Sequence, residues 1–309
     1  MKIIKKIFNL LTLVLIIFSL FNYKEISNFI VSNFIYNKNA IVEISKGEYS
    51  KEIDYQFVQI TDDFVAKNYQ HLLNILYTIL DSGNDSFSFY CDDKYKDCLN
   101  VIDDLIQNEN NTILADINNY VHPYYTYKSI VITTNNYGKV TVTLEKQYSK
   151  EDIIYVNEQL NIIDNTVAKE LESNQEKIKA IHDYIITNTT YDIERAKNMD
   201  SPTFKDSKTH TAYGLLTEKK SLCGGYSDLM SIYIHNLGIK NIRISGSKHV
   251  WNLVNIDGWK HLDATWDDPV TNTGEEILLY DYFFITTEEL TKADPVEHKF
   301  NKDIYIEAN

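Results

Sequence analysis

Three hydropathy patterns follow one another along the chain. The first is an apolar run from Ile7 to Phe21, which is apolar on every side of a helix. The second, up to about residue 150, mixes helical spacing with strand-like alternation, and the third begins with two long helical patterns and ends in alternating strands. The patterns predict a hydrophobic helix within residues 1–23, a small α+β unit over 24–150 and a mixed α+β domain over 151–309.

The apolar run has the make-up of an export signal. Lys2, Lys5 and Lys6 form a positive flank before this 15-residue run. A membrane-spanning helix needs about 20 residues, a length reached only when the run is extended from Ile3 to Tyr23. Small residues suited to signal cleavage are poorly placed, which favours an uncleaved anchor over a cleaved signal peptide. With the basic flank inside, the rest of the chain is expected outside the cytoplasm, membrane-anchored or secreted.

The second pattern predicts several short elements. Apolar residues recur at helical spacing between Thr61 and Leu80, with Thr61 as the expected N-cap. The remaining elements are a strand at 86–90, helices at 99–107 and 112–121, and a hairpin of strands at 126–134 and 139–148.

The chain has three cysteines, which is an odd number. Cys91 and Cys98 bracket a polar turn and could form a disulfide outside the cytoplasm, or remain two thiols in a reducing compartment. Cys223 is then left over as a free thiol.

The third pattern predicts a helix over 151–171 and another after a capping box of Ser173 and Glu176. A polar loop is expected from Asn188 to Lys208. Apolar spacing then predicts a helix from Cys223 to Leu237, followed by a strand at 242–245 and a hairpin of 250–256 with 259–264.

Cys223 begins a predicted amphipathic helix, in the sequence SLCGGYS. The positive end of a helix favours a thiolate there. Gly224 and Gly225 beside it would let a substrate backbone approach closely. Packing as a small hydrophobic residue is the alternative for Cys223.

The hairpin can bring His249 and Asp263 together in one of two registers. A two-residue turn at Asp257-Gly258 would place the two side chains on opposite faces. A three-residue loop from Ile256 to Gly258 would pair 251 with 263 and make His249 and Asp263 diagonal neighbours. In that register Cys223, His249 and Asp263 could serve as nucleophile, base and orienting carboxylate.

The chain resembles the transglutaminase-like superfamily, including its bacterial branch, in three motifs that follow one another in the family's order. They are CGGYS at Cys223, HVWN at His249 and HLDATWDDP at Asp263. The resemblance covers about residues 174–300. It implies a papain-like core, in which a helix carrying the cysteine packs on an antiparallel sheet carrying the histidine and aspartate. It also implies that Cys223, His249 and Asp263 are catalytic. The family needs a further oxyanion donor, and Tyr213 lies in the right upstream region, although core packing is the favoured interpretation of Tyr213.

The resemblance implies a cysteine acyltransferase or cysteine peptidase that acts on protein or cell-wall peptide, and it leaves the acceptor open. The alternative is a non-catalytic surface binding or scaffold protein with the same fold. No cofactor or metal is expected, since no calcium-binding loop surrounds Asp267 and Asp268. A formal charge of -14 makes nucleic acid an improbable partner.

Overall fold

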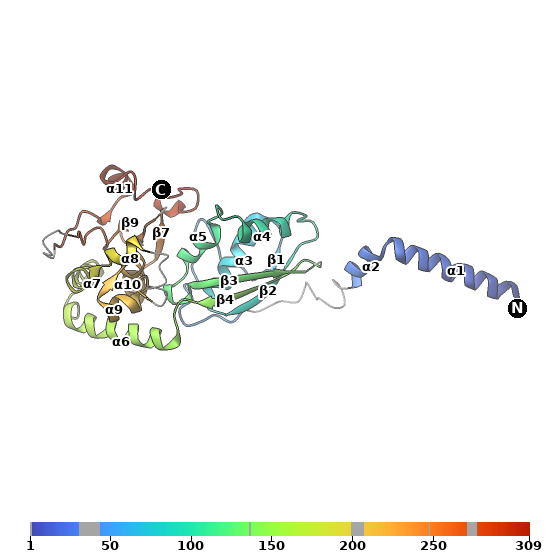
Figure 1. Ribbon diagram of the computed structural model, residues 1–309, viewed down its shortest axis with the longest axis horizontal. Coiled ribbons are helices and arrows are strands. Elements are labelled where there is room, and N and C mark those ends of the chain that lie inside the picture. Colours follow the sequence, from blue (N-terminus) through green and yellow to red (C-terminus); the bar gives the residue numbers. More distant parts are fainter. Residues whose placement is uncertain (1, 31–43, 136, 199–206, 247, 271–276) are drawn as a thin grey trace.

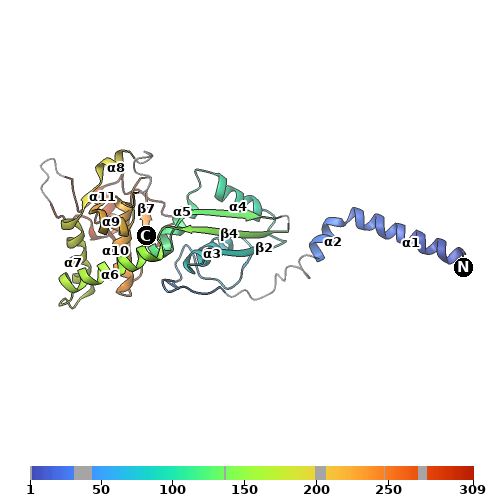
Figure 2. The ribbon, with the colours of Figure 1, turned by 60° about the horizontal axis from the view of Figure 1, so that its bottom comes forward.

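The computed structural model describes residues 2–30, 44–135, 137–198, 207–246, 248–270 and 277–309 (Figure 1). Helices α1 (Lys2–Phe21) and α2 (Tyr23–Ile30) project from one end of the body, and two further units follow along its length (Figures 1 and 2). Helix α1 covers the predicted apolar run. Among the residues described, no helix is long and apolar enough to cross a membrane. The membrane anchor remains a prediction.

The first unit contains a four-stranded sheet with helices beside it. Its sheet has the order β1-β2-β4-β3, with β1 parallel to β2 and the other pairs antiparallel. The elements are β1 (Val65–Ala66), α3 (Tyr69–Asp81), β2 (Ser86–Cys91), α4 (Cys98–Gln107), α5 (Ile113–Tyr120), the 3-10 helix η2 (Pro123–Tyr125), β3 (Tyr127–Thr134) and β4 (Lys139–Lys146).

The predicted helix from Thr61 is wrong at its start. Asn68 is the N-cap of α3, because its side chain accepts a hydrogen bond of 2.8 Å from the His71 N–H. Val65 and Ala66 instead pair with the end of β2, as strand β1. The other elements predicted for this unit are present, with ends shifted by one or two residues.

Cys91 and Cys98 form a disulfide, and Cys223 is the free cysteine. The bridge joins the end of β2 to the first residue of α4. The predicted pairing is therefore confirmed.

The second unit places helices against an antiparallel sheet of order β10-β9-β8-β7. Its first elements are α6 (Lys150–Val167), α7 (Asn174–Asn188), β5 (Thr190–Tyr191), α8 (Ile193–Lys197), α9 (Ala212–Glu218), β6 (Lys220–Ser221) and α10 (Cys223–Asn236). Strands β7 (Asn241–Ser245), β8 (Val250–Asn255), β9 (Trp259–Leu262) and β10 (Phe283–Ile285), helix α11 (Thr287–Ala293) and the 3-10 helix η4 (Ile306–Ala308) complete it.

The polar stretch expected to be a loop after Asn188 is partly ordered into secondary structure. Strand β5 pairs in parallel with β6, and Asp192 caps the short helix α8 by accepting from the Arg195 N–H at 2.9 Å. Residues 199–206 of this stretch lie outside the described residues. The predicted capping box of Ser173 and Glu176 is present at the start of α7.

The two units share one hydrophobic core. On one face of β8, Trp251 and Leu253 pack in a cluster with Tyr120 of α5 and Phe89 of β2. On the other face, Val254 packs with residues of α6, α7 and α10. Side chains near the C-terminus, including Tyr305, also belong to the first cluster. The sheet of the second unit is consequently covered on both faces.

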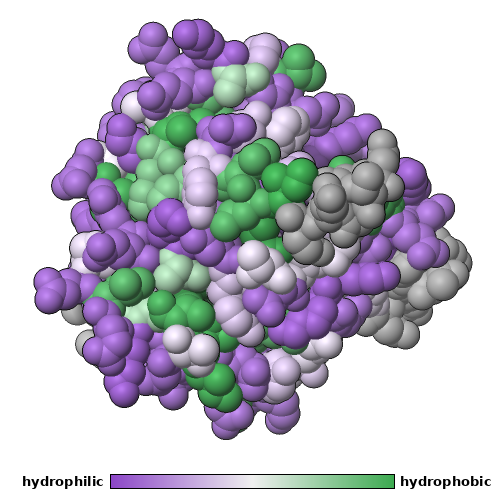
Figure 3. Space-filling model, turned by 90° about the vertical axis from the view of Figure 1, so that its left-hand side faces the viewer, coloured by the Kyte–Doolittle hydropathy of each residue, from purple (hydrophilic) through white to green (hydrophobic). Residues whose placement is uncertain are grey.

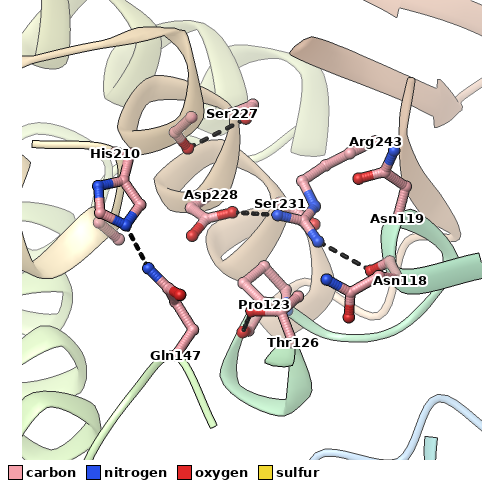
Figure 4. Close-up of polar contacts among 12 residues, drawn as sticks. Asn118, Asn119, Pro123, Thr126, Gln147, His210, Ser227, Asp228, Ser231 and Arg243 are labelled. Atoms are coloured by element: carbon pink, nitrogen blue, oxygen red, sulfur yellow. Dashed lines mark hydrogen bonds and ion pairs between the residues drawn. The ribbon is translucent and has the colours of Figure 1, made fainter. Parts of the chain in front are cut away.

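A buried ion pair lies where the two units meet (Figure 4). Arg243 of β7 donates to Asp228 of α10 at 2.5 Å and to the carbonyl oxygen of Asn118 at 2.9 Å. Tyr148 donates to the second carboxylate oxygen of Asp228 at 2.6 Å and accepts from the Ala212 N–H at 2.8 Å. Burial raises the pKa of Asp228, and the Arg243 charge opposes that rise. This network ties both units to the helix that begins at Cys223.

Replacing Arg243 with Met should lower the free energy of unfolding by about 3–5 kcal/mol, because it leaves the buried Asp228 without its countercharge. Urea unfolding followed by circular dichroism measures the loss. Lys46→Met, which removes an exposed pair with Glu52, is the control and should cost less than about 1 kcal/mol. Equal effects of the two substitutions would contradict the importance of the buried pair.

Candidate active site

Cys223 is the first residue of α10 and is partly exposed. A helix leaves its first N–H groups without acceptors in the helix, so the backbone at Cys223 presents donors beside the thiol. A Cβ added at Gly224 would lie 2.7 Å from the carbonyl oxygen of His210, and one at Gly225 would lie 2.1 Å from Ser221 Oγ. Both glycines therefore admit the protein's own chain close to the start of α10, which corrects their interpretation as room for a substrate backbone.

The hairpin adopts the three-residue register. Asn255 pairs with Trp259 and Asn252 with Leu262, so the loop consists of residues 256–258. Asp257 and Gly258 have φ values of 51° and 95°, the left-handed region that glycine tolerates best. Of the two registers that the sequence left open, the structure has the one expected to bring His249 and Asp263 together.

His249 lies between the carboxylate and the thiol. Its Nε2 is hydrogen-bonded to Asp263 Oδ2, and the imidazole also interacts with the Cys223 side chain. The ring stacks on Trp251, with centroids 5.6 Å apart and planes 15° from parallel. Burial by itself lowers the pKa of His249, but the Asp263 carboxylate and these hydrogen bonds outweigh it and raise the pKa to about 10. The arrangement favours a protonated imidazole beside the thiol.

Asp263 is almost fully buried, with 2% of its surface exposed. Its Oδ1 accepts hydrogen bonds from the backbone N–H groups of Thr265, at 2.9 Å, and Trp266, at 3.3 Å. Its Oδ2 accepts from His249 and from a second histidine, His298. Burial raises the pKa of the carboxyl, but the charge of His249 and the hydrogen bonds hold that pKa below its usual range.

The segment after Asp263 is held by two more carboxylates. Asp267 contacts His182 of α7 at 3.1 Å and accepts from the Tyr282 N–H at 3.0 Å. Asp268 accepts from the Tyr226 hydroxyl of α10 at 2.5 Å. These contacts account for Asp267 and Asp268 as groups that fix the turn carrying Asp263.

Tyr213 contacts residues outside the site formed by Cys223, His249 and Asp263. It makes an edge contact with Tyr155, with ring centroids 5.4 Å apart, and Lys208 Nζ lies 4.5 Å from its ring centroid. These are packing contacts. They agree with core packing, the favoured interpretation of Tyr213, and its role as an oxyanion donor stays a prediction.

Two residues at the site escaped prediction. His298 contacts Asp263, as described above. Tyr191 pairs with Ser221 in the short β5–β6 sheet; burial, followed by the charges of Cys223 and Asp263, raises the pKa of Tyr191 to about 12. The strand Thr190–Tyr191 gave no usable pattern, because two residues are too few to show alternation.

His249, Asp263 and His298 could in principle hold a metal ion, since one ligand atom from each lies within 4.8 Å of the others. The same atoms are, however, already hydrogen-bonded to one another. An ion would therefore have to replace contacts that satisfy the buried carboxylate.

Asp263→Asn should lower the pKa of His249 from about 10 towards about 6.5, because it removes the charge that stabilises the imidazolium. In the wild type, the stability gained from the raised pKa is complete below about pH 6.5 and is lost as the pH rises through about 10. The variant should lack this dependence.

NMR titration of the histidine C2 protons measures the pKa directly. Asp257→Asn, in the turn of the same hairpin, is the matched control and should leave the titration of His249 in place. A His249 pKa that is unchanged in folded Asp263→Asn protein would contradict the electrostatic role of Asp263.

Comparison with known proteins shows that the part of the chain with this geometry is similar to a known family. Residues 162–264 match the model of the transglutaminase-like superfamily, and Cys223, His249 and Asp263 all lie within that span. The chain is 26% identical over 162 residues to kyphoscoliosis peptidase of Mus musculus, a match that covers 46% of this chain and 24% of the relative. The Homo sapiens protein of the same name is 26% identical over 165 residues, with the same coverage of 46% and 24%. The chain thus spans about a quarter of the length of these curated relatives.

A solved structure described as the crystal structure of a TGase aligns with a TM-score of 0.35 and 18% identity, over 45% of this chain and 44% of that chain. The family match rests on the sequence of the span that holds the three site residues. Residues 162–264 therefore carry a match to the transglutaminase-like superfamily, and this span contains all three site residues.

Proposed function

We propose that this protein is an exported, membrane-anchored thiol enzyme that performs acyl transfer or hydrolysis at amide bonds of proteins or cell-wall peptides. The observation that carries the proposal is the position of His249, which is hydrogen-bonded to Asp263 and interacts with the Cys223 side chain. A nucleophile, a base and an orienting carboxylate joined in this way are what thiol acyl transfer requires. The match of residues 162–264 to the transglutaminase-like superfamily supports it.

In the first half-reaction, the Cys223 thiolate attacks the carbonyl carbon of an amide. The oxyanion that forms accepts a hydrogen bond from the N–H at the start of α10. His249, as imidazolium, gives its proton to the nitrogen of the leaving amine while the C–N bond breaks. A thioester on Cys223 and a neutral His249 remain. Asp263 stabilises the imidazolium and fixes its ring orientation.

In the second half-reaction, an acceptor attacks the thioester while His249 takes up its proton. Water as acceptor releases a carboxylic acid, whereas a primary amine such as a lysine side chain forms a new amide. In both cases the C–S bond breaks and restores the thiolate–imidazolium pair. Peptidase, amidase and transglutaminase activities therefore share this chemistry and differ in the acceptor.

Two observations support export, namely the disulfide and the exposed apolar side chains of α1. Cys91 and Cys98 form a disulfide, which persists in oxidising compartments. Apolar side chains of α1 are exposed, among them Leu15 at 63%, Leu20 at 68% and Phe21 at 86%, as expected of a segment that binds an apolar environment. The opposite end of the molecule is mostly hydrophilic with separate small apolar patches, a surface suited to water (Figure 3).

Cys223→Ala should abolish product formation, with a loss of about 10³-fold or more, because no other group of the site can form the thioester. Cys223→Ser should lose nearly as much, since a hydroxyl is far less ionised than a thiol. Mass spectrometry of cell-surface material incubated with each protein detects cleaved, deamidated or cross-linked peptides. Ser227→Ala, one turn further along α10, is the control and should retain activity.

Products that appear equally with wild type and with Cys223→Ala would refute the proposal that this protein is a thiol enzyme. If both proteins bound the same material and neither changed it, the non-catalytic scaffold would be the correct function.

The topology can be tested on intact cells. Added protease should remove the body of the protein and leave a short N-terminal stub, because the basic flank of α1 is expected to remain inside. A cytoplasmic marker protein that stays intact is the control. Full protection of the body would contradict export, and release into the medium with a trimmed N-terminus would show a secreted protein instead of an anchored one.

A further inference from the structure

We propose that His298 is a positioning residue of this site, which holds the Asp263 carboxylate in the orientation that serves His249. The inference rests on the proposed function, because it assumes that Asp263 acts on Cys223 through His249. His298 lies outside the span that matches the superfamily, 35 residues after Asp263.

Both ring nitrogens of His298 face carboxylates. Nε2 lies 2.8 Å from Asp263 Oδ2, and Nδ1 lies 2.9 Å from Asp294 Oδ2. The side chain of His298 is fully buried. The same oxygen, Asp263 Oδ2, also accepts from His249, so His298 contacts the atom on which the catalytic imidazole depends.

An aromatic cage fixes the ring of His298. Tyr282 stacks on it, with centroids 4.9 Å apart and planes 16° from parallel. Trp251 and Trp266 meet it edge-on, at centroid distances of 4.9 and 4.8 Å. A ring enclosed in this way has one available orientation, and it can impose that orientation on a carboxylate.

The outer carboxylate is fixed as well. Asp294 follows α11, and its Oδ1 accepts from the N–H groups of Val296 at 3.0 Å and Glu297 at 3.2 Å. Its own N–H donates to the carbonyl of Leu290 at 2.9 Å. A chain of hydrogen bonds therefore runs from the end of α11 through His298 to Asp263.

The contact with His298 also affects the Asp263 carboxyl. Together with the charge and hydrogen bond of His249, the His298 hydrogen bond opposes the effect of burial and holds the pKa of Asp263 below its usual range. The contact therefore helps to keep a buried carboxylate ionised.

The chain offers a matched control in His182. This histidine is also fully buried between two carboxylates, with Asp183 at 3.1 Å and Asp267 at 3.1 Å. It holds the same turn at Asp267 and does not touch Asp263. Substituting it tests the general cost of losing a buried histidine in this region.

The experiment uses the full-length chain in mild detergent and a chelator, with three substitutions of His298. Gln places a donor near the position of Nε2 and keeps the contact to Asp263, Asn keeps the contact to Asp294 instead, and Phe keeps only the ring. The first readout is the rate of Cys223 alkylation by iodoacetamide at pH 6 and pH 9. The second is hydrolysis of p-nitrophenyl acetate, which acylates and deacylates the thiol.

We expect His298→Phe and His298→Asn to lower kcat by about tenfold to a hundredfold with little change in KM, because a misplaced carboxylate misorients His249. Their alkylation rate should fall roughly tenfold at pH 6 and stay near the wild-type rate at pH 9. His298→Gln should remain close to wild type in both readouts. His182→Gln should lower the unfolding temperature and leave the ratio of alkylation rates at the two pH values as in the wild type.

Equal behaviour of folded Gln and Asn variants would overturn the inference, as would a folded Phe variant with wild-type kcat. If the Phe variant does not fold, the comparison of Gln with Asn decides. A different result bears on the proposed function: wild-type Cys223 that reacts at pH 6 no faster than in urea-unfolded protein would refute the activated thiol itself.

Discussion

The burial of one negative charge, on Asp263, determines much of this architecture. A carboxylate that is removed from water costs several kcal/mol unless donors replace the water, so each of its oxygens must be satisfied. Two backbone N–H groups serve Oδ1 and two imidazoles serve Oδ2. Those donors come from the turn after β9, the start of β8 and the segment after α11. The ionised carboxylate is stable only when all three segments have reached their final positions.

The same requirement explains why the turn at 263–268 is tied down so strongly. His182 and Tyr226 bind its other carboxylates, and these two side chains belong to α7 and α10. The helix that presents the thiol is therefore joined to the turn that presents the carboxylate. A displacement of α10 would alter the distance from Cys223 to His249 and the hydrogen bonds of the turn together.

Sequence reasoning succeeded where local rules decide the structure. The helix start at Cys223 and the capping box at Ser173 follow from short-range patterns, whereas the same kind of pattern left two registers open for the hairpin with the loop that ends at Gly258. It failed where distant segments decide. Val65 forms a strand only because the end of β2 lies beside it, and His298 reaches Asp263 only because the C-terminal segment folds back over the sheet. Gly224 and Gly225 correctly indicated that another chain segment approaches the start of α10 closely, but that segment belongs to the protein itself and is not a substrate.

The shared core has a consequence for the biosynthesis of the protein. Tyr305 packs in the core with Tyr120 of the first unit, and its hydroxyl donates to Asp116 at 2.7 Å. The segment from His298 to Tyr305 is synthesised after the first unit and after Asp263. Until it emerges, Asp263 lacks one of its two imidazoles and the core between the units is open. A nascent chain would thus contain Cys223, His249 and Asp263 before His298 is in place, and the Asp263 carboxylate would gain its full set of hydrogen bonds only after the later segment has packed.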